Sequence, residues 1–320
     1  MCRYSSYVFK PESFMNALAD VRYLSPATRS QVETRLDPEL GVYWAYMNPQ
    51  PRPCITNEVL TDLQAVIDTL VVDDGWITEL GERHRVRYGV IASRSPRVFS
   101  LGGDLSLFRS AILSSDRAGL LRYGKKCIDV LLAWHRSCEL DMTTLSLVQG
   151  DALGGGFEGA LSASVVVAEE SARLGFPEVL FNLFPGMGAY SFLARKVGRR
   201  SAERLITSGV IYSARELYDL GVVDVITPDG TGEAAVYSYI RKHSKQGNGR
   251  RAFERARGVV EPVTHDEMLR VLDVWVDAAL RLEERDLRMM ERLVRAQHRI
   301  NDEHLANRSG NVVPLQAVVA

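Results

Sequence analysis

Two glutamates stand in apolar, glycine-rich surroundings near the middle of the chain. Glu158 ends the run Leu153-Gly-Gly-Gly-Phe-Glu158, and Glu178 ends Gly175-Phe-Pro-Glu178, 20 residues further on. An apolar segment holds a carboxylate only when that group is hydrogen-bonded, paired or neutralised. We interpret the two as a general acid and base, because partial burial raises a carboxyl pKa toward the range in which such catalysis works best. For either glutamate alone, the alternative is a carboxylate that stabilises a helix start.

Two glycine turns could supply backbone amides to the same reaction. Gly102 and Gly103 lie in Ser100-Leu-Gly-Gly-Asp-Leu105, and Gly155 lies in the turn that precedes Glu158. A tight turn at a helix start presents free N–H groups, and two that converge polarise a carbonyl oxygen and stabilise an enolate. These residues therefore predict acid/base chemistry at the α- and β-carbons of an acyl thioester.

The second turn also fits a different binding motif. Gly154-Gly-Gly-Phe-Glu-Gly159 matches G-x-G-x-x-G, which is typical of dinucleotide-binding folds. Glu158 would then lie beside a pyrophosphate that backbone amides should meet. The next acidic pair, Glu169-Glu170, follows after about ten residues, where the motif requires an acidic residue about 20 residues on. We therefore favour the oxyanion interpretation and expect no cofactor.

The elements that must position these residues alternate between strand and helix. Strand patterns cover 42–47, 86–92, 144–149, 165–168 and 222–226, and helical patterns cover 57–70, 105–113, 118–138, 157–164 and 189–197. This alternation predicts an α/β fold with a layered core.

Four segments follow from these patterns. We expect an N-terminal extension over 1–37 with a helix near 11–19, a core with the active site over 38–230, a helical region over 231–306, and a loose tail over 307–320. Helical spacing over 233–244 and about 264–304 gives the third segment a broad apolar face. We interpret that segment as a lid over a pocket and a subunit contact. Packing on its own domain is the alternative for any single residue there.

Composition excludes several functions. The chain has 39 Lys and Arg residues and 40 Asp and Glu residues, which leaves a net charge of −1. This charge produces no overall electrostatic attraction to nucleic acid or to an anionic membrane. The chain has no apolar window long enough for a membrane span and no signal-peptide pattern. Its four cysteines lack C-x-x-C spacing, so we expect reduced thiols and a cytoplasmic location. Its six histidines show no metal-ligand spacing, and no G-x-S-x-G elbow occurs, so we expect neither a metal nor a serine nucleophile.

The motifs resemble those of the crotonase (enoyl-CoA hydratase/isomerase) superfamily. The matching runs are Phe99-Ser-Leu-Gly-Gly-Asp-Leu105, Val148-Gln-Gly-Asp-Ala-Leu-Gly-Gly-Gly-Phe-Glu158, Gly175-Phe-Pro-Glu178 and Pro185-Gly-Met-Gly188. The resemblance implies the crotonase fold, a β-β-α superhelical spiral core with a C-terminal helical region. It also implies an oxyanion hole at the N–H groups of Gly103 and Gly155, catalysis by Glu158 and Glu178, and a homo-oligomer, trimer or hexamer.

A closer resemblance is to the RpfF-type diffusible signal factor synthases. It adds Pro177-Glu-Val-Leu-Phe181, Leu183-Phe-Pro-Gly-Met-Gly-Ala-Tyr-Ser-Phe192, Trp275-Val-Asp277 and Met290-Glu-Arg-Leu-Val-Arg-Ala-Gln297. It implies dehydration of a 3-hydroxyacyl thioester on acyl carrier protein and hydrolysis of the enoyl thioester, which releases a cis-2-unsaturated fatty acid signal for quorum sensing. It also implies an acyl pocket lined by Gly102, Met187, Trp275 and Leu293, although Trp275 and Leu293 could simply be core.

Two rival functions share these motifs. An enoyl-CoA hydratase of fatty acid metabolism would use the same oxyanion hole and both glutamates on an acyl-CoA, and would release a thioester. A crotonase-like binding module would dock the receiver domain of a sensor kinase, a partner that the closer resemblance also implies.

Overall fold

The computed structural model describes residues 31–306, with side chains to residue 295. A six-stranded sheet in the order β1-β2-β5-β7-β9-β12 forms its centre. Every neighbouring pair is parallel except β1 with β2. The strands are β1 (Val32–Asp37), β2 (Val42–Met47), β5 (Tyr88–Ser93), β7 (Thr143–Val148), β9 (Val165–Glu169) and β12 (Val225–Thr227).

A second sheet has four strands in the order β11-β10-β8-β6. They are β6 (Val98–Ser100), β8 (Asp151–Leu153), β10 (Arg173–Gly175) and β11 (Ile211–Ser213), and the first three pair in parallel. A separate hairpin joins β3 (Trp76–Glu79) to β4 (Glu82–Arg85).

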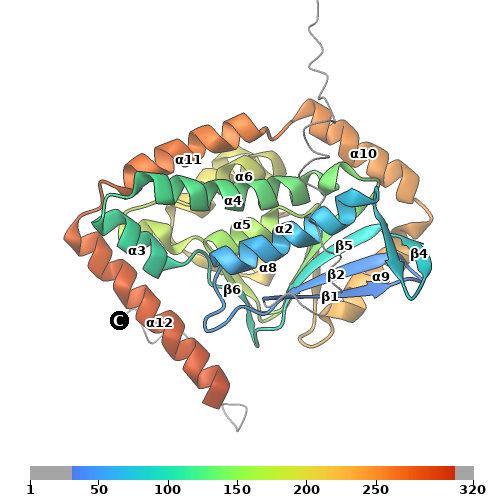
Figure 1. Cartoon of the computed structure of the whole chain (residues 1–320), viewed down its shortest axis with the longest axis horizontal. Coiled ribbons are helices and arrows are strands. Elements are labelled where there is room, and N and C mark those ends of the chain that lie inside the picture. Colours follow the sequence, from blue (N-terminus) through green and yellow to red (C-terminus); the bar gives the residue numbers. More distant parts are fainter. Residues whose placement is uncertain (1–30, 307–320) are drawn as a thin grey trace, which may run out of the picture.

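Helices surround both sheets (Figure 1). They are α2 (Asn57–Val72), α3 (Leu105–Leu113), α4 (Arg117–His135), α5 (Gly155–Leu161), α6 (Ala189–Val197), α7 (Arg199–Thr207), α8 (Ala214–Asp219), α9 (Gly232–Ser244), α10 (Gly247–Val260), α11 (His265–Ala279) and α12 (Glu284–Ala306), with 3₁₀ turns η3 (Ser137–Glu139) and η4 (Pro177–Phe181).

The chain order of these elements repeats. From β5 the chain passes to β6 in the second sheet and then to α3 and α4; from β7 it passes to β8 and α5; from β9 it passes to β10 and η4. Each repeat places one strand in each sheet before a helix. This is the β-β-α spiral that the resemblance to the crotonase superfamily implies.

The central sheet is covered on both faces, which explains its long apolar strands. Successive side chains of β2 point to opposite faces. Trp44 and Tyr46 pack in the cluster that includes Val236 and Ile240 of α9. Tyr43, Ala45 and Met47 join the main core, which includes buried residues of α2 and α4. The main core therefore lies between this sheet and the helices that also approach the active site.

The structure differs from the sequence-based expectation in several places. Residues 32–37, assigned to the N-terminal extension, form β1 on the edge of the central sheet. The helical stretch over about 264–304 divides into α11 and α12, and the side chain of Asp286 accepts a hydrogen bond from Glu283 N at the start of α12. Helices α7, α8 and α10 are additional to the expected helices; α7 and α8 are short, and α10 is rich in arginine and glycine. The expected helix near 11–19, the tail over 307–320 and Cys2 lie outside the described residues.

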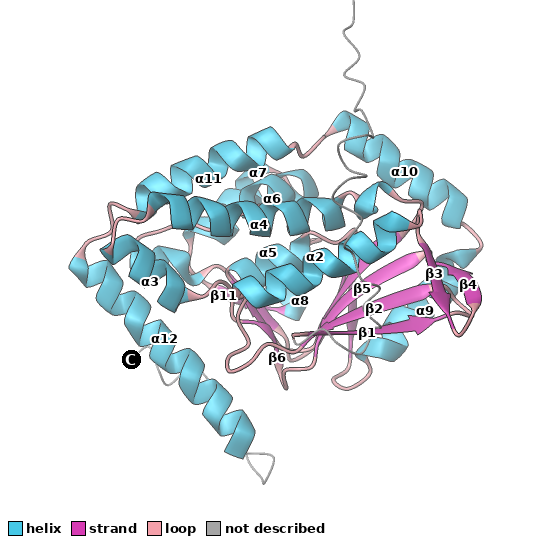
Figure 2. Ribbon diagram, in the orientation of Figure 1, coloured by secondary structure: helices cyan, strands magenta, loops and turns pink. Residues whose placement is uncertain are grey.

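Helix α11 packs along α4 above the core (Figure 2). The two helices approach closely at Gly124, where an added Cβ would lie 2.3 Å from Leu272 Cδ1. Arg195 of α6 holds the start of α11 through a 2.8 Å ion pair with Glu267. Arg117 of α4 pairs with Asp273 and Asp277 further along α11, both at 3.1 Å. These contacts fix the C-terminal helices relative to the active site.

We predict that Gly124→Ala destabilises the protein by about 1–3 kcal/mol, because the added methyl overpacks against the buried Leu272. Urea denaturation would measure the change in the free energy of unfolding. The matched control is Gly258→Ala in α10, where an added Cβ meets no atom within 4 Å. That control should be neutral or more stable by up to about 1 kcal/mol, since alanine is the better helix former. Equal stabilities for the two variants would contradict the tight α4–α11 contact.

Candidate active site

Glu158 lies in the first turn of α5, directly after β8. Gly154 makes the turn between them with a φ of 52°, a conformation that favours glycine. The Glu158 side chain is only 1% exposed, and its Oε1 accepts hydrogen bonds from Met187 N at 2.8 Å and Ala189 N at 3.0 Å. Burial raises the pKa of Glu158 to about 7, although the two hydrogen bonds oppose this shift.

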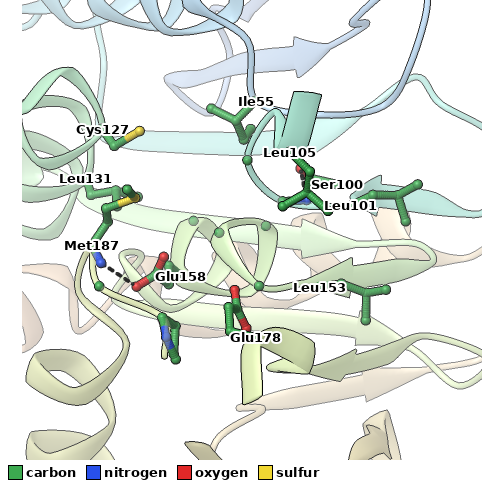
Figure 3. Close-up of a pocket in the computed structure, with 18 of the residues that line it drawn as sticks. Ile55, Ser100, Leu101, Leu105, Cys127, Leu131, Leu153, Glu158, Glu178 and Met187 are labelled. Atoms are coloured by element: carbon green, nitrogen blue, oxygen red, sulfur yellow. Dashed lines mark hydrogen bonds between the residues drawn. The ribbon is translucent and has the colours of Figure 1, made fainter. Parts of the chain in front are cut away.

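Glu178 lies in η4, directly after β10, and faces Glu158 in the same cavity (Figure 3). An added Cβ at Gly154 would lie 2.3 Å from Glu178 Oε1, so the glycine turn makes room for this carboxyl group. Glu178 Oε2 is buried and has no hydrogen-bond partner among the described residues. Burial, and then the charge of Glu158, raise the pKa of Glu178 to about 8. Because the two charges interact, the glutamates titrate as a pair, and one of them holds a proton at neutral pH.

The two glycine turns bring two backbone amides together. An ideal Cβ on Gly155 would lie 3.4 Å from Gly103 N, and one on Gly102 would lie 3.2 Å from Gly155 N. Gly155 is the first residue of α5, so its N–H has no acceptor within the helix. Hydrogen bonds hold the first turn, from Gly102 N to Ser100 Oγ at 3.2 Å and from Ile55 N to Gly102 O at 2.8 Å. The geometry therefore suits two N–H donors to one carbonyl oxygen.

One cavity of about 190 Å³ contains all of these groups. Its wall includes every site residue that the sequence analysis named: Gly102, Gly103, Gly155, Glu158, Glu178, Met187, Trp275 and Leu293. Figure 3 shows Met187 and Glu158 on one side of the cavity and Ser100, Leu101 and Leu153 on the other. Most of the remaining wall is apolar, which suits an acyl chain beside the polar catalytic groups.

The comparisons with known proteins agree with this geometry. A family model described as "Enoyl-CoA hydratase/isomerase" matches residues 48–264, more than half of the chain. The chain belongs to the enoyl-CoA hydratase/isomerase family.

Individual members of the family share only a modest fraction of their sequence with this chain. A "Probable enoyl-CoA hydratase" of Bacillus subtilis is 30% identical over 182 residues, which cover 57% of this chain and 64% of the relative, a little under two thirds of its length. An enoyl-CoA hydratase from Bacillus halodurans superimposes with a TM-score of 0.67 at 18% identity, over 82% of this chain and 99% of the other.

An enoyl-CoA hydratase/isomerase from Xanthobacter autotrophicus gives a TM-score of 0.66 at 19% identity, over 90% and 100% of the two chains. These structural similarities confirm the crotonase fold. The superfamily resemblance is confirmed as well, whereas the closer resemblance to signal factor synthases remains a prediction.

The structure also bears on other types of site. Gly154, the first glycine of the G-x-G-x-x-G match, lies against the carboxyl group of Glu178, which is an unfavourable neighbour for a pyrophosphate. Within residues 31–306, no three His, Cys, Asp or Glu side chains gather as a metal site, and no helix there is long and apolar enough to cross a membrane. The cysteines in this range, Cys54, Cys127 and Cys138, are buried.

Sequence reasoning missed one wall of the cavity. Cys127, Val130, Leu131 and Trp134 of α4 all line it, and Tyr123 lines it one turn earlier. Their spacing of three and four residues marks one helix face. The same spacing describes a helix that packs on a solid core, so the sequence alone does not distinguish the two.

The raised pKa of Glu178 predicts how stability changes with pH. Its folded-state pKa of about 8 lies above its ordinary value of 4.5, so the folded protein retains a proton that the unfolded chain releases between these values. The free energy of unfolding should therefore fall as the pH rises from about 5 to about 8. Glu178→Gln removes part of this pH dependence. At pH 9 the free energy of unfolding of the variant should exceed that of the wild type by on the order of 1–3 kcal/mol.

Urea denaturation over this pH range would measure the effect. The matched control is Glu82→Gln, since Glu82 has a side chain that is 83% exposed. The free energy of unfolding of Glu82→Gln should change with pH as that of the wild type does. Parallel curves for Glu178→Gln and the wild type would show that the Glu178 carboxyl group is ionised at neutral pH.

Proposed function

We propose that this protein adds water to a 2-enoyl thioester and catalyses the reverse dehydration of a 3-hydroxyacyl thioester. The observation that carries the proposal is the pair Glu158 and Glu178, both with raised pKa values, beside two adjacent backbone amides in one apolar cavity. Family membership supports the class of reaction.

The groups in the cavity have complementary roles in this proposal. The N–H groups of Gly103 and Gly155 bind the thioester carbonyl oxygen, where negative charge develops in the enolate. In dehydration, the ionised glutamate takes the α-proton, and the C–H electron pair forms the enolate. The protonated glutamate then gives its proton to the β-hydroxyl, which leaves as water while the enolate collapses to the enoyl thioester. Since one of the pair holds a proton at neutral pH, both forms are present together.

The acyl carrier has two candidates in this proposal. The similar Bacillus subtilis protein is called an enoyl-CoA hydratase, and this name favours an acyl-CoA substrate. Acyl carrier protein is the alternative that the closer sequence resemblance implies. The same catalytic groups serve both carriers, because only the thioester and the acyl chain reach the glutamates.

A second candidate function is release of a free cis-2-unsaturated fatty acid signal. The observation that favours it is the part played by the C-terminal helices, since Trp275 of α11 and Leu293 of α12 line the cavity. Both residues lie in the segments that resemble signal factor synthases. In this function a glutamate also activates water to attack the thioester carbon, and the carrier thiol leaves. A trimeric or hexameric assembly and a sensor-kinase receiver domain as partner belong to the same proposal.

We predict that Glu158→Gln and Glu178→Gln each lower kcat by about 10²- to 10⁴-fold, because glutamine keeps the shape but transfers no proton. A hydration assay on a 2-enoyl-CoA, monitored through the loss of enoyl absorbance, would measure kcat. Circular dichroism would show that both variants fold. Near-normal turnover in both would contradict the proposed roles, and Glu82→Gln serves as the control for a charge change far from the cavity.

The two candidate functions predict different products from 3-hydroxydodecanoyl thioesters on coenzyme A and on acyl carrier protein. A hydratase leaves an enoyl thioester in equilibrium with the hydroxyacyl thioester. A signal synthase releases free cis-2-dodecenoic acid. Mass spectrometry after a separation that resolves double-bond geometry would identify the product, and the preferred carrier would show in the same experiment.

A further inference from the structure

The cavity continues past the catalytic pair between helices α4 and α5. On α4, the lining residues beyond Tyr123 run from Cys127 to Trp134, about 10 Å along the helix at 1.5 Å per residue. On α5 and its C-cap they run from Gly155 through Glu158 to Ser162, over a similar length. The near end of this stretch of α4 lies at the first glycine turn, since an added Cβ at Gly103 would be 3.4 Å from the hydroxyl oxygen of Tyr123. The part of the cavity toward Trp134 therefore lies beyond the catalytic pair.

This inner part of the cavity is closed and mostly apolar. Trp134 is 1% exposed and lies against β5, since an added Cβ at Gly89 would be 2.8 Å from its Cη2. Met47, Leu63 and Val130 also line the cavity and are buried. The outer part differs, because Leu180 at the cavity wall is 45% exposed. A thioester substrate therefore enters from the outer part and extends its chain toward Trp134.

Gly159 lies on the wall of the cavity, one helical turn beyond Gly155. It is partly accessible, whereas its neighbours Glu158 and Ala160 are buried. An added Cβ at Gly159 meets no atom within 4 Å. By contrast, an added Cβ at Gly156 in the same helix would lie 2.3 Å from Ser100 O. The helix packing thus requires a glycine at 156 but leaves open space at 159.

We propose that the substrate's acyl chain runs past Gly159 and ends against Trp134, so that these two residues set the accepted chain length and select medium-length acyl thioesters. This inference rests on the proposed function. Each methylene that enters the inner cavity leaves water for an apolar wall, which strengthens binding about fourfold. A side chain at position 159 would begin in that open space, since an added Cβ there meets no atom within 4 Å.

Gly159→Leu tests this inference, with Gly258→Leu in α10 as the matched control, because both glycines are helical and have open space at the Cβ position. The substrates are butenoyl, hexenoyl, octenoyl, decenoyl and dodecenoyl thioesters of coenzyme A. For the wild type and the control, kcat/KM should rise about fourfold per added methylene until the chain reaches Trp134. For Gly159→Leu, the kcat/KM of each longer chain is compared with that of the same variant on the butenoyl thioester. Its gain with chain length should disappear.

Gly159→Ala should shorten the preferred chain by a smaller amount and keeps the helix, since alanine is favoured there. Binding of dodecanoic acid, measured by calorimetry, gives a readout without turnover and should weaken in Gly159→Leu but not in Gly258→Leu. A wild type that hydrates no thioester would overturn the proposed function, while the binding measurement would still test the channel. Equal chain-length profiles and equal dodecanoic acid binding in the wild type and Gly159→Leu would overturn the inference itself.

Discussion

The active site depends on the close approach of two backbone turns, the one at Gly102 and the one that starts α5. An added Cβ at Gly102 would lie 2.8 Å from Leu153 O, and one at Gly156 would lie 2.3 Å from Ser100 O. No side chain larger than hydrogen fits between segments at this separation. The same contact sets the two amides side by side and points Glu158 into the cavity, so the geometry for binding a carbonyl oxygen and the position of a carboxyl group have a common origin.

Burial of the two carboxyl groups costs free energy, because both are removed from water. Glu158 receives two backbone hydrogen bonds, whereas Glu178 Oε2 receives none from the described residues. Isolation of this kind destabilises a fold and is typical of sites where a substrate or water completes the hydrogen bonding. The surrounding helices compensate through extensive apolar burial, and ion pairs such as Arg195–Glu267 hold α11 in place.

Much of this arrangement could be predicted from the sequence. The strands from Val42 to Thr227 show long apolar runs, and the types and spacing of the residues in the glycine turns beside Glu158 and Glu178 are enough to indicate paired amides and acid/base chemistry. The inner wall of the cavity could not be predicted, because Cys127 and Trp134 on α4 have the same spacing in a solid core as in a hollow one. Likewise, apolar residues of α10 such as Phe253 and Val260 follow a helical spacing but are exposed, and contacts such as Arg251 with Asp141 that hold this helix depend on tertiary structure.

The order of elements along the chain has a consequence for synthesis. Both sheets and all of the catalytic residues lie before α9, whereas Trp275 and Leu293 lie in the last two described helices. During translation the N-terminal segments of a chain are made first, whereas a domain generally folds as a unit. All of the catalytic residues are therefore synthesised before α11 and α12, and the apolar cavity lacks part of its wall until these helices dock. Docking of these helices is then the event that closes the compartment.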